Sequence, residues 1–489
     1  AGAMAEGEAL VRESFEEEPS LQLLASLYGK AAPSIADVLG LLYANKKIGG
    51  LVRRYRDQGQ MDRAAAAELD VLLDEVSLCL QRLEQFSWFL HRHATAKITG
   101  EQTAAQHAHE TQLLRNNIVE VKKAELISGY IPLEESFMRN SVDKALKGGG
   151  KDEEDKVSSL VDEVFYVLKR CTFRALQTSS LNAMGDIIMY VNTLLVTTYK
   201  DALEQLLSST DRLGELNLSG GLANLFRGTT VGGQVADMSR RQLGSAFDGT
   251  AYNNFQVSAG YVSKLLEALE GELRRVFGGA NKKDEDKARE CLSELKNANQ
   301  VLTKSLQDAI SRLGSVLERF FGPQLNAFGA LDFESVQGEY GESQAVAELI
   351  SSIESTLEPF RGELNEANFD SLVVTIVDQI VAPSFEKLVL GRKPCSFSLS
   401  GAMQFDRDLR SLSSFLSGLA SRSVRDKLTR LSQIAIVLNL DDPSEIWEYN
   451  WGEQGAAGSA SVVWRLSGEE VKRVMERRVD WGKERLAGL

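Results

Sequence analysis

Apolar residues recur every three or four positions along most of the chain, which is the spacing of one face of an α-helix. Between residues 252 and 321 this pattern predicts two long antiparallel helices joined by residues 278–285. The alternation of apolar and polar residues that would indicate strands is almost absent. Residues 373–381 are rich in β-branched side chains, but they fit a buried helix as well as a strand. The pattern therefore predicts an all-α protein.

Glycine-rich and charged stretches divide this helical sequence into successive bundles. Residues 147–156 read as a charged surface loop, residues 216–251 as a flexible linker, and residues 129–132 as an interruption within a helix. Short connections make sequential helices antiparallel neighbours, so the bundles are expected to stack into an elongated rod. The predicted parts are a cloning scar at 1–4, ahead of an N-terminal truncation, a helical bundle at 5–100, a second at 101–215, the linker at 216–251, a third bundle at 252–389, and a C-terminal helical domain at 390–489.

Two capping signals lie in the C-terminal domain. Asp442 is the predicted N-cap of a new helix, with Pro443 in its first turn and Glu445 three residues after the cap. Ser467 and Glu470 have the spacing of a capping box before the last helix. No nucleophile lies beside a base in this region and no cluster of ligands is visible, so these residues predict a packing unit.

A single charge lies at the edge of the apolar face of helix 424–438. Arg430 is expected to be at least partly buried there, and a buried charge needs a partner. One candidate is Asp426, one turn earlier on the same helix, and the other is Glu470 at the start of the last helix. Glu470 also has a local alternative, in which it only completes its capping box and pairs with Arg473. The sequence leaves the two alternatives open.

Short elements of the C-terminal domain carry a family resemblance. They lie at 405–406, 409–412, 424–427, 430–433, 438–440 and 464–486, and weaker similarity extends through 124–146 and 157–184. In these elements the chain resembles the family of conserved oligomeric Golgi complex subunit 4, and the resemblance covers most of the chain. It implies a rod of helical bundles, as in subunits of the exocyst and of the Golgi-associated retrograde protein complex.

The resemblance also implies a function. The chain would be a non-enzymatic subunit of a peripheral Golgi complex that captures vesicles in retrograde intra-Golgi transport and couples to SNARE assembly. The implied partners are the other subunits of the complex, a Golgi SNARE of the syntaxin-5 type and its Sec/Munc-type regulator, and the implied location is the cytoplasmic face of Golgi membranes. Two alternatives remain, a subunit of another helical-rod tether of the exocyst type and a generic helical adaptor.

Charge and composition narrow the classes of function. The net charge of −14 argues against nucleic acid as a partner, because phosphate contacts need a basic surface. We find no run of 18 apolar residues and no signal-peptide pattern, so we expect no membrane span and only indirect membrane contact. The four cysteines are about a hundred residues apart and read as reduced, buried thiols.

No cofactor, metal or catalytic residue is expected. The histidines form two His-x-His pairs, at 91 and 93 and at 107 and 109, and residues two apart on a helix point to different faces. An all-α enzyme with a cofactor in its bundle would carry Glu-x-x-His pairs, and this sequence has none. The glycine-rich segment 219–234 lacks the Gly-Lys-Ser/Thr of a phosphate-binding loop and follows no strand.

Aromatic and basic residues gather near the C-terminus, where four of the five tryptophans lie between residues 447 and 481. Most of them fit core or hinge packing, whereas a partly exposed ring would mark a partner-binding surface. The candidates for such a surface are Trp447, Trp451, Trp481, Arg473 and Arg477. A second basic cluster, at Arg53, Arg54 and Arg56, reads as a solvated helix face.

Overall fold

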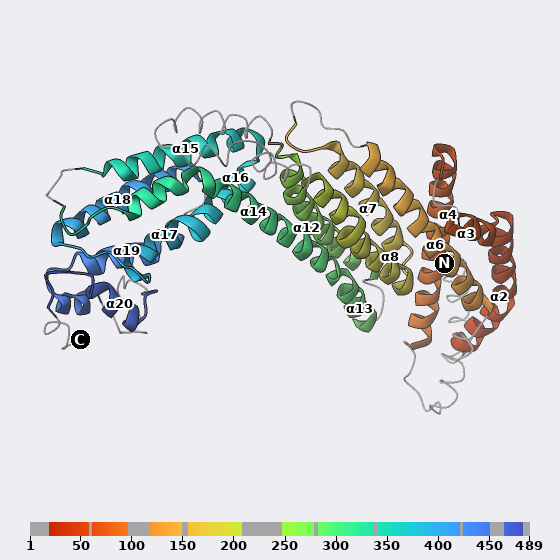
Figure 1. Cartoon of the computed structure of the whole chain (residues 1–489). Coiled ribbons are helices and arrows are strands. Elements are labelled where there is room, and N and C mark those ends of the chain that lie inside the picture. The colour runs from red at the N-terminus through yellow and green to blue at the C-terminus, as the bar shows by residue number, and fades with distance from the viewer. Residues whose placement is uncertain are drawn as a thin grey trace. The chain divides into compact units, whose positions relative to one another are not determined.

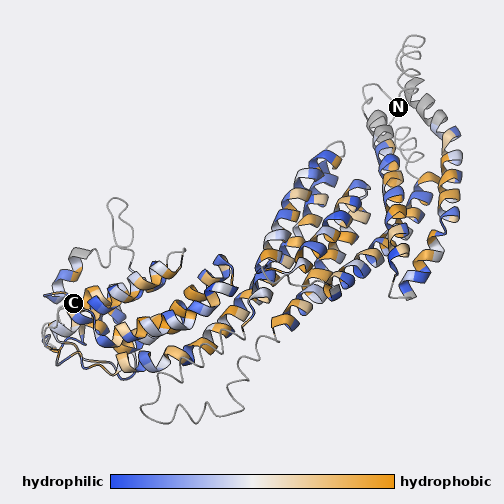
Figure 2. Ribbon diagram, turned by 90° about the horizontal axis from the view of Figure 1, so that it is seen from above, coloured by the Kyte–Doolittle hydropathy of each residue, from blue (hydrophilic) through white to orange (hydrophobic). Residues whose placement is uncertain are grey.

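The computed structural model describes residues 19–57, 61–95, 118–148, 155–207, 247–277, 282–336, 341–420, 424–449 and 464–482. Within these ranges the regular secondary structure is helical, apart from one isolated parallel bridge between Phe397 and Arg478, and turns and irregular segments join the helices. The all-α class is therefore confirmed for the described part of the chain (Figure 1). The ribbons carry apolar and polar positions interleaved along each helix, as expected of amphipathic helices that pack in bundles (Figure 2).

The described helices fall into an N-terminal and a C-terminal series. The first comprises α2 (Pro19–Asn45), α3 (Ile48–Asp57), α4 (Arg63–Thr95), α6 (Ile118–Gly148), α7 (Ser159–Gln177), α8 (Leu181–Leu194) and the π-helical η1 (Leu195–Tyr199). The second comprises α12 (Thr250–Phe277), α13 (Lys282–Ser293), α14 (Leu295–Gly329), α15 (Gln344–Glu363), α16 (Glu366–Ile376), the π-helical η2 (Val377–Val381), α17 (Ala382–Leu390), α18 (Leu399–Leu419), α19 (Arg425–Leu438), the 3₁₀-helix η3 (Pro443–Tyr449) and α20 (Gly468–Met475).

The chain forms two compact units, and the first contains residues 1–153, 158–202 and 257–302. Its central element is α6, which packs against α2, α3, α4, α7 and α8. The predicted interruption at 129–132 is wrong, because α6 runs through Pro132. Gly129 lies where α3 approaches closely, and a Cβ atom at this position would be 2.5 Å from Ile48 Cγ2. Packing on five neighbours thus overrides the local cost of proline and glycine in a helix.

The second unit contains residues 154–157, 203–256 and 303–489. Its core includes a cluster of five phenylalanines that are at most 1% exposed, namely Phe328, Phe333, Phe385, Phe397 and Phe405. Ring centroids in this cluster lie 4.5 Å apart between Phe328 and Phe385 and 5.0 Å apart between Phe333 and Phe397. The cluster joins α14, α17, α18 and the segments between them into one core.

This shared core crosses the domain boundary that was predicted between residues 389 and 390. The structure places both sides of that boundary in one unit, because Phe385 and Phe405 pack on each other. The predicted linker 216–251 falls largely outside the described residues. Its last part is not a linker, since Phe247 and Ala251 are 5% and 4% exposed and belong to the core. The rod-like stacking of bundles stays a prediction.

None of the helices in the described ranges is both long enough and apolar enough to cross a membrane.

Candidate functional site: charged clusters and the C-terminal surface

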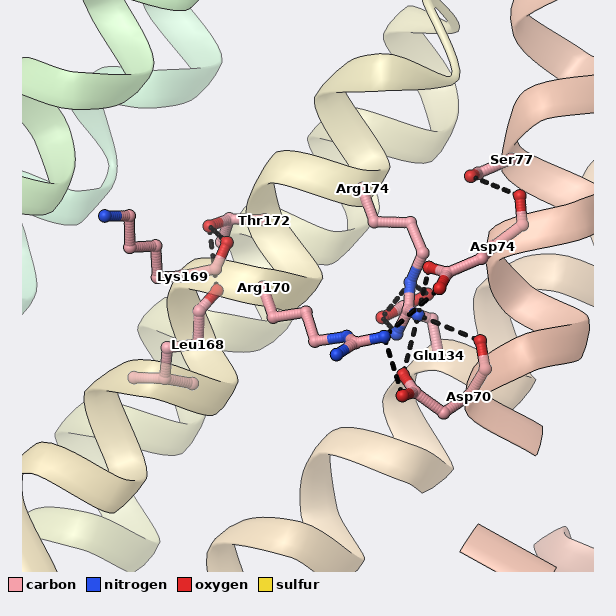
Figure 3. Close-up of polar contacts among 9 residues, drawn as sticks. All are labelled: Asp70, Asp74, Ser77, Glu134, Leu168, Lys169, Arg170, Thr172 and Arg174. Atoms are coloured by element: carbon pink, nitrogen blue, oxygen red, sulfur yellow. Dashed lines mark hydrogen bonds and ion pairs between the residues drawn. The ribbon is translucent and has the colours of Figure 1, made fainter. Parts of the chain in front are cut away.

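A buried charged cluster joins three helices of the first unit. Arg174 of α7 lies between Glu134 of α6 and the two acidic residues Asp70 and Asp74 of α4 (Figure 3). Its guanidinium binds Glu134 through two parallel bonds, Nη2 to Oε1 at 2.7 Å and Nε to Oε2 at 2.9 Å. Nη1 lies 2.8 Å from both Asp70 Oδ1 and Asp74 Oδ1. Arg170, one turn earlier on α7, lies 2.7 Å from Asp70 Oδ2.

Burial makes this cluster a fixed structural element. The side chains of Arg174 and Glu134 are 3% and 0% exposed, whereas Asp74 is 54% exposed. Burial alone would lower the pKa of Arg174, but the Glu134 carboxylate more than offsets it and the pKa is raised. The pKa of Cys171 and of Tyr130 is raised well above the ordinary value, first by burial and then by Glu134. Arg174 is therefore charged, and its thiol and phenol neighbours stay protonated at neutral pH.

This cluster was not predicted from the sequence. A signal was present, because Asp70 and Asp74 are four residues apart on one helix and Arg170 and Arg174 are four apart on another. Residues with that spacing lie on one face of their helix, so the two pairs match in spacing and are opposite in charge. Glu134 gives no comparable signal, because it is the one charged residue among the buried residues of α6 and has no second charge at helical spacing beside it on that face.

A second cluster, in the second unit, contains the predicted pair. Arg430 Nη2 lies 2.7 Å from Glu470 Oε1, and the two side chains are 31% and 27% exposed. A third residue that the sequence analysis did not name, Glu386 of α17, lies 3.2 Å from Arg430 Nε. Arg430 also donates from Nη1 to the backbone carbonyl of Arg465 at 2.8 Å. Asp426 is not the partner, and the cluster connects α17, α19 and α20.

Glu470 takes part in both the capping box and the pair with Arg430, whereas Arg473 donates to the backbone carbonyl of Leu390 and is not its partner. Ser467 N–H donates to Glu470 Oε2 at 2.8 Å while Glu470 N–H donates to Ser467 Oγ at 3.3 Å, which is a complete capping box. The bond from Arg430 is the main cause that lowers the pKa of Glu470 to about 2, against a smaller effect of burial. The same carboxylate therefore caps α20 and ties it to α19.

We expect Arg430→Met to lower the free energy of unfolding by about 1–2 kcal/mol, because a pair that is one-third exposed lies between surface and buried pairs. Glu470→Gln should cost less, since glutamine at this position still completes a capping box. A double-mutant cycle measured by urea unfolding should give a coupling energy of about 1 kcal/mol. Glu469→Gln is the matched control and should change stability by less than about 0.5 kcal/mol. Strictly additive effects would contradict an energetic role for the pair.

The depressed pKa of Glu470 also predicts a pH dependence. Because the folded-state pKa lies below the ordinary value of 4.5, the stabilisation is complete above about pH 4.5 and is lost as the pH falls toward 2. The difference in unfolding free energy between the wild-type chain and Glu470→Gln should therefore shrink over this interval. Urea titrations at a series of pH values measure it, and a difference that stays constant down to about pH 2 would contradict the assignment.

The caps predicted at Asp442 and Glu445 lie at the start of η3. Asp442 Oδ1 accepts hydrogen bonds from Ser444 N–H at 3.0 Å and from Ser444 Oγ at 2.6 Å. Glu445 Oε2 accepts from Asp441 N–H at 3.1 Å. The predicted helix is present after these residues and is a 3₁₀-helix of seven residues.

The residues predicted for a partner-binding surface differ in their exposure to solvent. Trp447 is 52% exposed, Arg473 is exposed and Arg477 is half-buried. Trp481 is 5% exposed and cannot contribute a surface ring, which corrects its assignment. It packs against Arg478, whose guanidinium carbon lies 4.4 Å from the centroid of the Trp481 ring. Trp451 lies outside the described residues.

Among the described residues, no group of histidine, cysteine, aspartate or glutamate side chains is arranged to hold a metal ion. The four cysteines are free thiols, but only Cys171 is buried as predicted, and Cys79, Cys291 and Cys395 are half-buried. The two clusters fix the positions of the helices relative to their neighbours through charge-assisted hydrogen bonds. The surfaces that the helices present are thereby fixed in shape.

Comparison with known proteins adds the family. Residues 250–473 match the family described as "Conserved oligomeric Golgi complex subunit 4, C-terminal", and residues 38–207 match "COG4 transport protein, middle alpha-helical bundle". The chain is 30% identical to conserved oligomeric Golgi complex subunit 4 of Arabidopsis thaliana over 426 residues, which is 86% of this chain and 54% of the relative. It is 30% identical to the subunit of Bos taurus and 28% identical to that of Drosophila melanogaster, covering 55% and 56% of those proteins.

The chain thus spans about half the length of the curated relatives it matches. Among solved structures, the C-terminal domain of the exocyst subunit Sec6p aligns at 10% identity with a TM-score of 0.48, covering 76% of this chain and 89% of that one. The two family matches together account for most of the sequence, and they are separated only by residues 208–249. By its sequence, the chain belongs to the family of conserved oligomeric Golgi complex subunit 4.

Proposed function

We propose that the chain is a non-enzymatic subunit of the conserved oligomeric Golgi tethering complex, which helps to capture vesicles in retrograde intra-Golgi transport. The observation that carries the proposal is the match of two regions, 38–207 and 250–473, to one family. The chain acts as a peripheral component on the cytoplasmic face of Golgi membranes. Its direct partners are other subunits of the complex.

Coupling to SNARE assembly is part of the same proposal. The partners are a syntaxin-5-type SNARE and its Sec/Munc-type regulator, and their contacts lie either on this chain or in the half of the relatives' length that it does not cover. Helical bundles suit this role, because several separate surfaces can each contribute a modest contact. The buried cluster around Arg174 and the partly exposed cluster around Arg430 support it, because both hold the helices that carry these surfaces.

The test is co-purification. The tagged chain is mixed with each other subunit of the complex in turn, with the syntaxin-5-type SNARE, and with exocyst subunits as the control. Selective binding of at least one Golgi-complex subunit is the expected result. Binding to exocyst subunits instead, or to no subunit of the Golgi complex, would contradict the proposal.

A further inference from the structure

An open apolar groove lies between two helices of the first unit. Helices α2 and α4 both pack against α6, and the space between them has a volume of about 570 Å³. Its walls are mainly apolar, with Ile35 and Val38 on α2 and Leu78 and Leu83 on α4. Neither charged cluster described above contributes to these walls.

The groove is flanked by further exposed apolar side chains. The wall residues Val38 and Leu78 are 64% and 54% exposed, and Leu41 of α2 and Val71 of α4, within about two turns of them along the same helices, are each 59% exposed. At about 100° per residue, Leu41 lies about 20° from the groove residue Ser34. Single exposed apolar residues are ordinary, but four on the two helices that border one apolar groove exceed scattered exposure, and such groupings mark interaction sites.

The shape favours a helix over a small ligand. Sites for small molecules cover about 70–90% of the ligand surface, whereas the rims of this groove are themselves exposed to solvent. A groove between two neighbouring helices is instead a surface on which a third helix can pack, as in a helical bundle. The bound helix would carry apolar residues at positions i, i+3, i+4 and i+7.

The charged residues of the groove indicate that the bound helix carries an acidic side chain. The groove residue Glu75 of α4 forms an ion pair with Lys46, which directly follows the last residue of α2. Arg82, about 10 Å further along α4, donates only to Gln85 Oε1 of its own helix, at 3.2 Å, among the bonds within the described ranges. A cation that lines an apolar groove and has no carboxylate beside it in the described part of the chain is complementary to an acidic side chain.

We propose that the groove between α2 and α4 binds an amphipathic helix of another subunit of the complex, with an acidic side chain of that helix facing Arg82. The proposal rests on the proposed function. The apolar walls supply the contact area, and Arg82 sets the direction in which the helix lies because the Glu75 end is already neutralised by Lys46.

The experiment uses the full chain and the individual subunits of the conserved oligomeric Golgi complex as probes. Val38→Asp and Leu78→Asp, each at an exposed position, should leave folding unchanged and weaken binding to one subunit by at least tenfold. Arg82→Glu should weaken the same binding, and reversal of the facing acidic residue should restore it. Met189→Asp is the control, because Met189 is equally exposed, at 62%, on α8. Far-UV circular dichroism verifies that each variant is folded.

A photo-crosslinking residue at position 78 identifies the occupant. The expected adduct is a peptide of another subunit with apolar residues at helical spacing and an aspartate or glutamate. If the wild-type chain binds subunits and the groove variants bind them equally well, the groove proposal is overturned while the proposed function stands. An adduct only with a second copy of this chain, or with a peptide that lacks the helical pattern, also overturns it. Failure of the wild-type chain to bind any subunit overturns both proposals.

Discussion

Arg174→Met is expected to lower the free energy of unfolding by about 3–5 kcal/mol, because it leaves a buried carboxylate without a cation. Glu134 is 0% exposed, and the bonds to it that the structure gives come from the Arg174 guanidinium. Its carboxylate cannot be hydrated without opening the contacts among α4, α6 and α7. Urea unfolding followed by far-UV circular dichroism measures the loss.

Substitution of the other partner, Glu134, should lower the free energy of unfolding by less. Glu134→Gln removes the buried anion, but Arg174 keeps Asp70 and Asp74, which are 20% and 54% exposed. The expected loss is about 1–2 kcal/mol. The double variant with Arg174→Met and Glu134→Gln should be more stable than Arg174→Met alone, since no buried charge is then unpaired.

Arg275 provides the matched control for Arg174. Its side chain is 72% exposed and pairs with Glu272 one turn earlier on the same helix. Arg275→Met should therefore lower the free energy of unfolding far less than Arg174→Met does, because solvent screens an exposed pair. Equal losses from Arg174→Met and Arg275→Met would contradict the assignment of the Arg174 cluster as a buried, stabilising contact.

Asn253→Leu is expected to have the second-largest effect, about 3 kcal/mol. Asn253 is 0% exposed, and its Nδ2 donates at 2.9 Å to the backbone carbonyls of Lys156 and Glu363. Its Oδ1 accepts from Asn365 N–H at 2.9 Å and from Asn368 Nδ2 at 3.0 Å. One amide thus ties the start of α12 to the junction between α15 and α16.

Leucine has a similar size but forms none of these bonds. Each buried polar group left without a partner costs about 1–3 kcal/mol, and partial rearrangement reduces the sum. Asn299→Leu is the control, because Asn299 is half-buried and its bonding partners Ala259 O and Ser263 Oγ are near solvent. It should cost about 1 kcal/mol or less. A loss at position 253 no larger than this would contradict the role of the Asn253 amide.

The helices could be predicted from the sequence because the signals that form them are local. Apolar spacing identified α12, but the second predicted helix is divided at Glu294 into α13 and α14. Residues 282–285, predicted as part of the connection, belong to α13, and the ambiguous residues 373–381 are helical in α16 and η2. The capping box of Ser467 and Glu470 involves atoms only three residues apart. Where the local signal opposed the tertiary contacts, the prediction failed, as at Pro132 in α6.

The candidate site was predictable only in part. The position of Arg430 at the edge of an apolar face indicated that it needs a partner, and the structure brings Glu470 to it. The second carboxylate, Glu386, lies 44 residues away on α17 and gave no signal. The sequence does not reveal whether a tryptophan side chain is buried, so Trp481 was a candidate for the partner surface. In the structure the Arg478 guanidinium lies over its ring.

The sequence by itself determined the all-α class, most helix positions and the capping residues, because hydrogen bonds within helices and caps join residues three or four positions apart. The tertiary structure alone decided which polar side chains are buried, as at the Arg174 guanidinium and the Asn253 amide, whose partners lie about 40 to 110 residues away. It also decided that Phe385 and Phe405 share one core across the predicted boundary at residue 390. The physical reason is that burial depends on which helix faces meet, and contacts over such separations leave no periodic pattern in the chain.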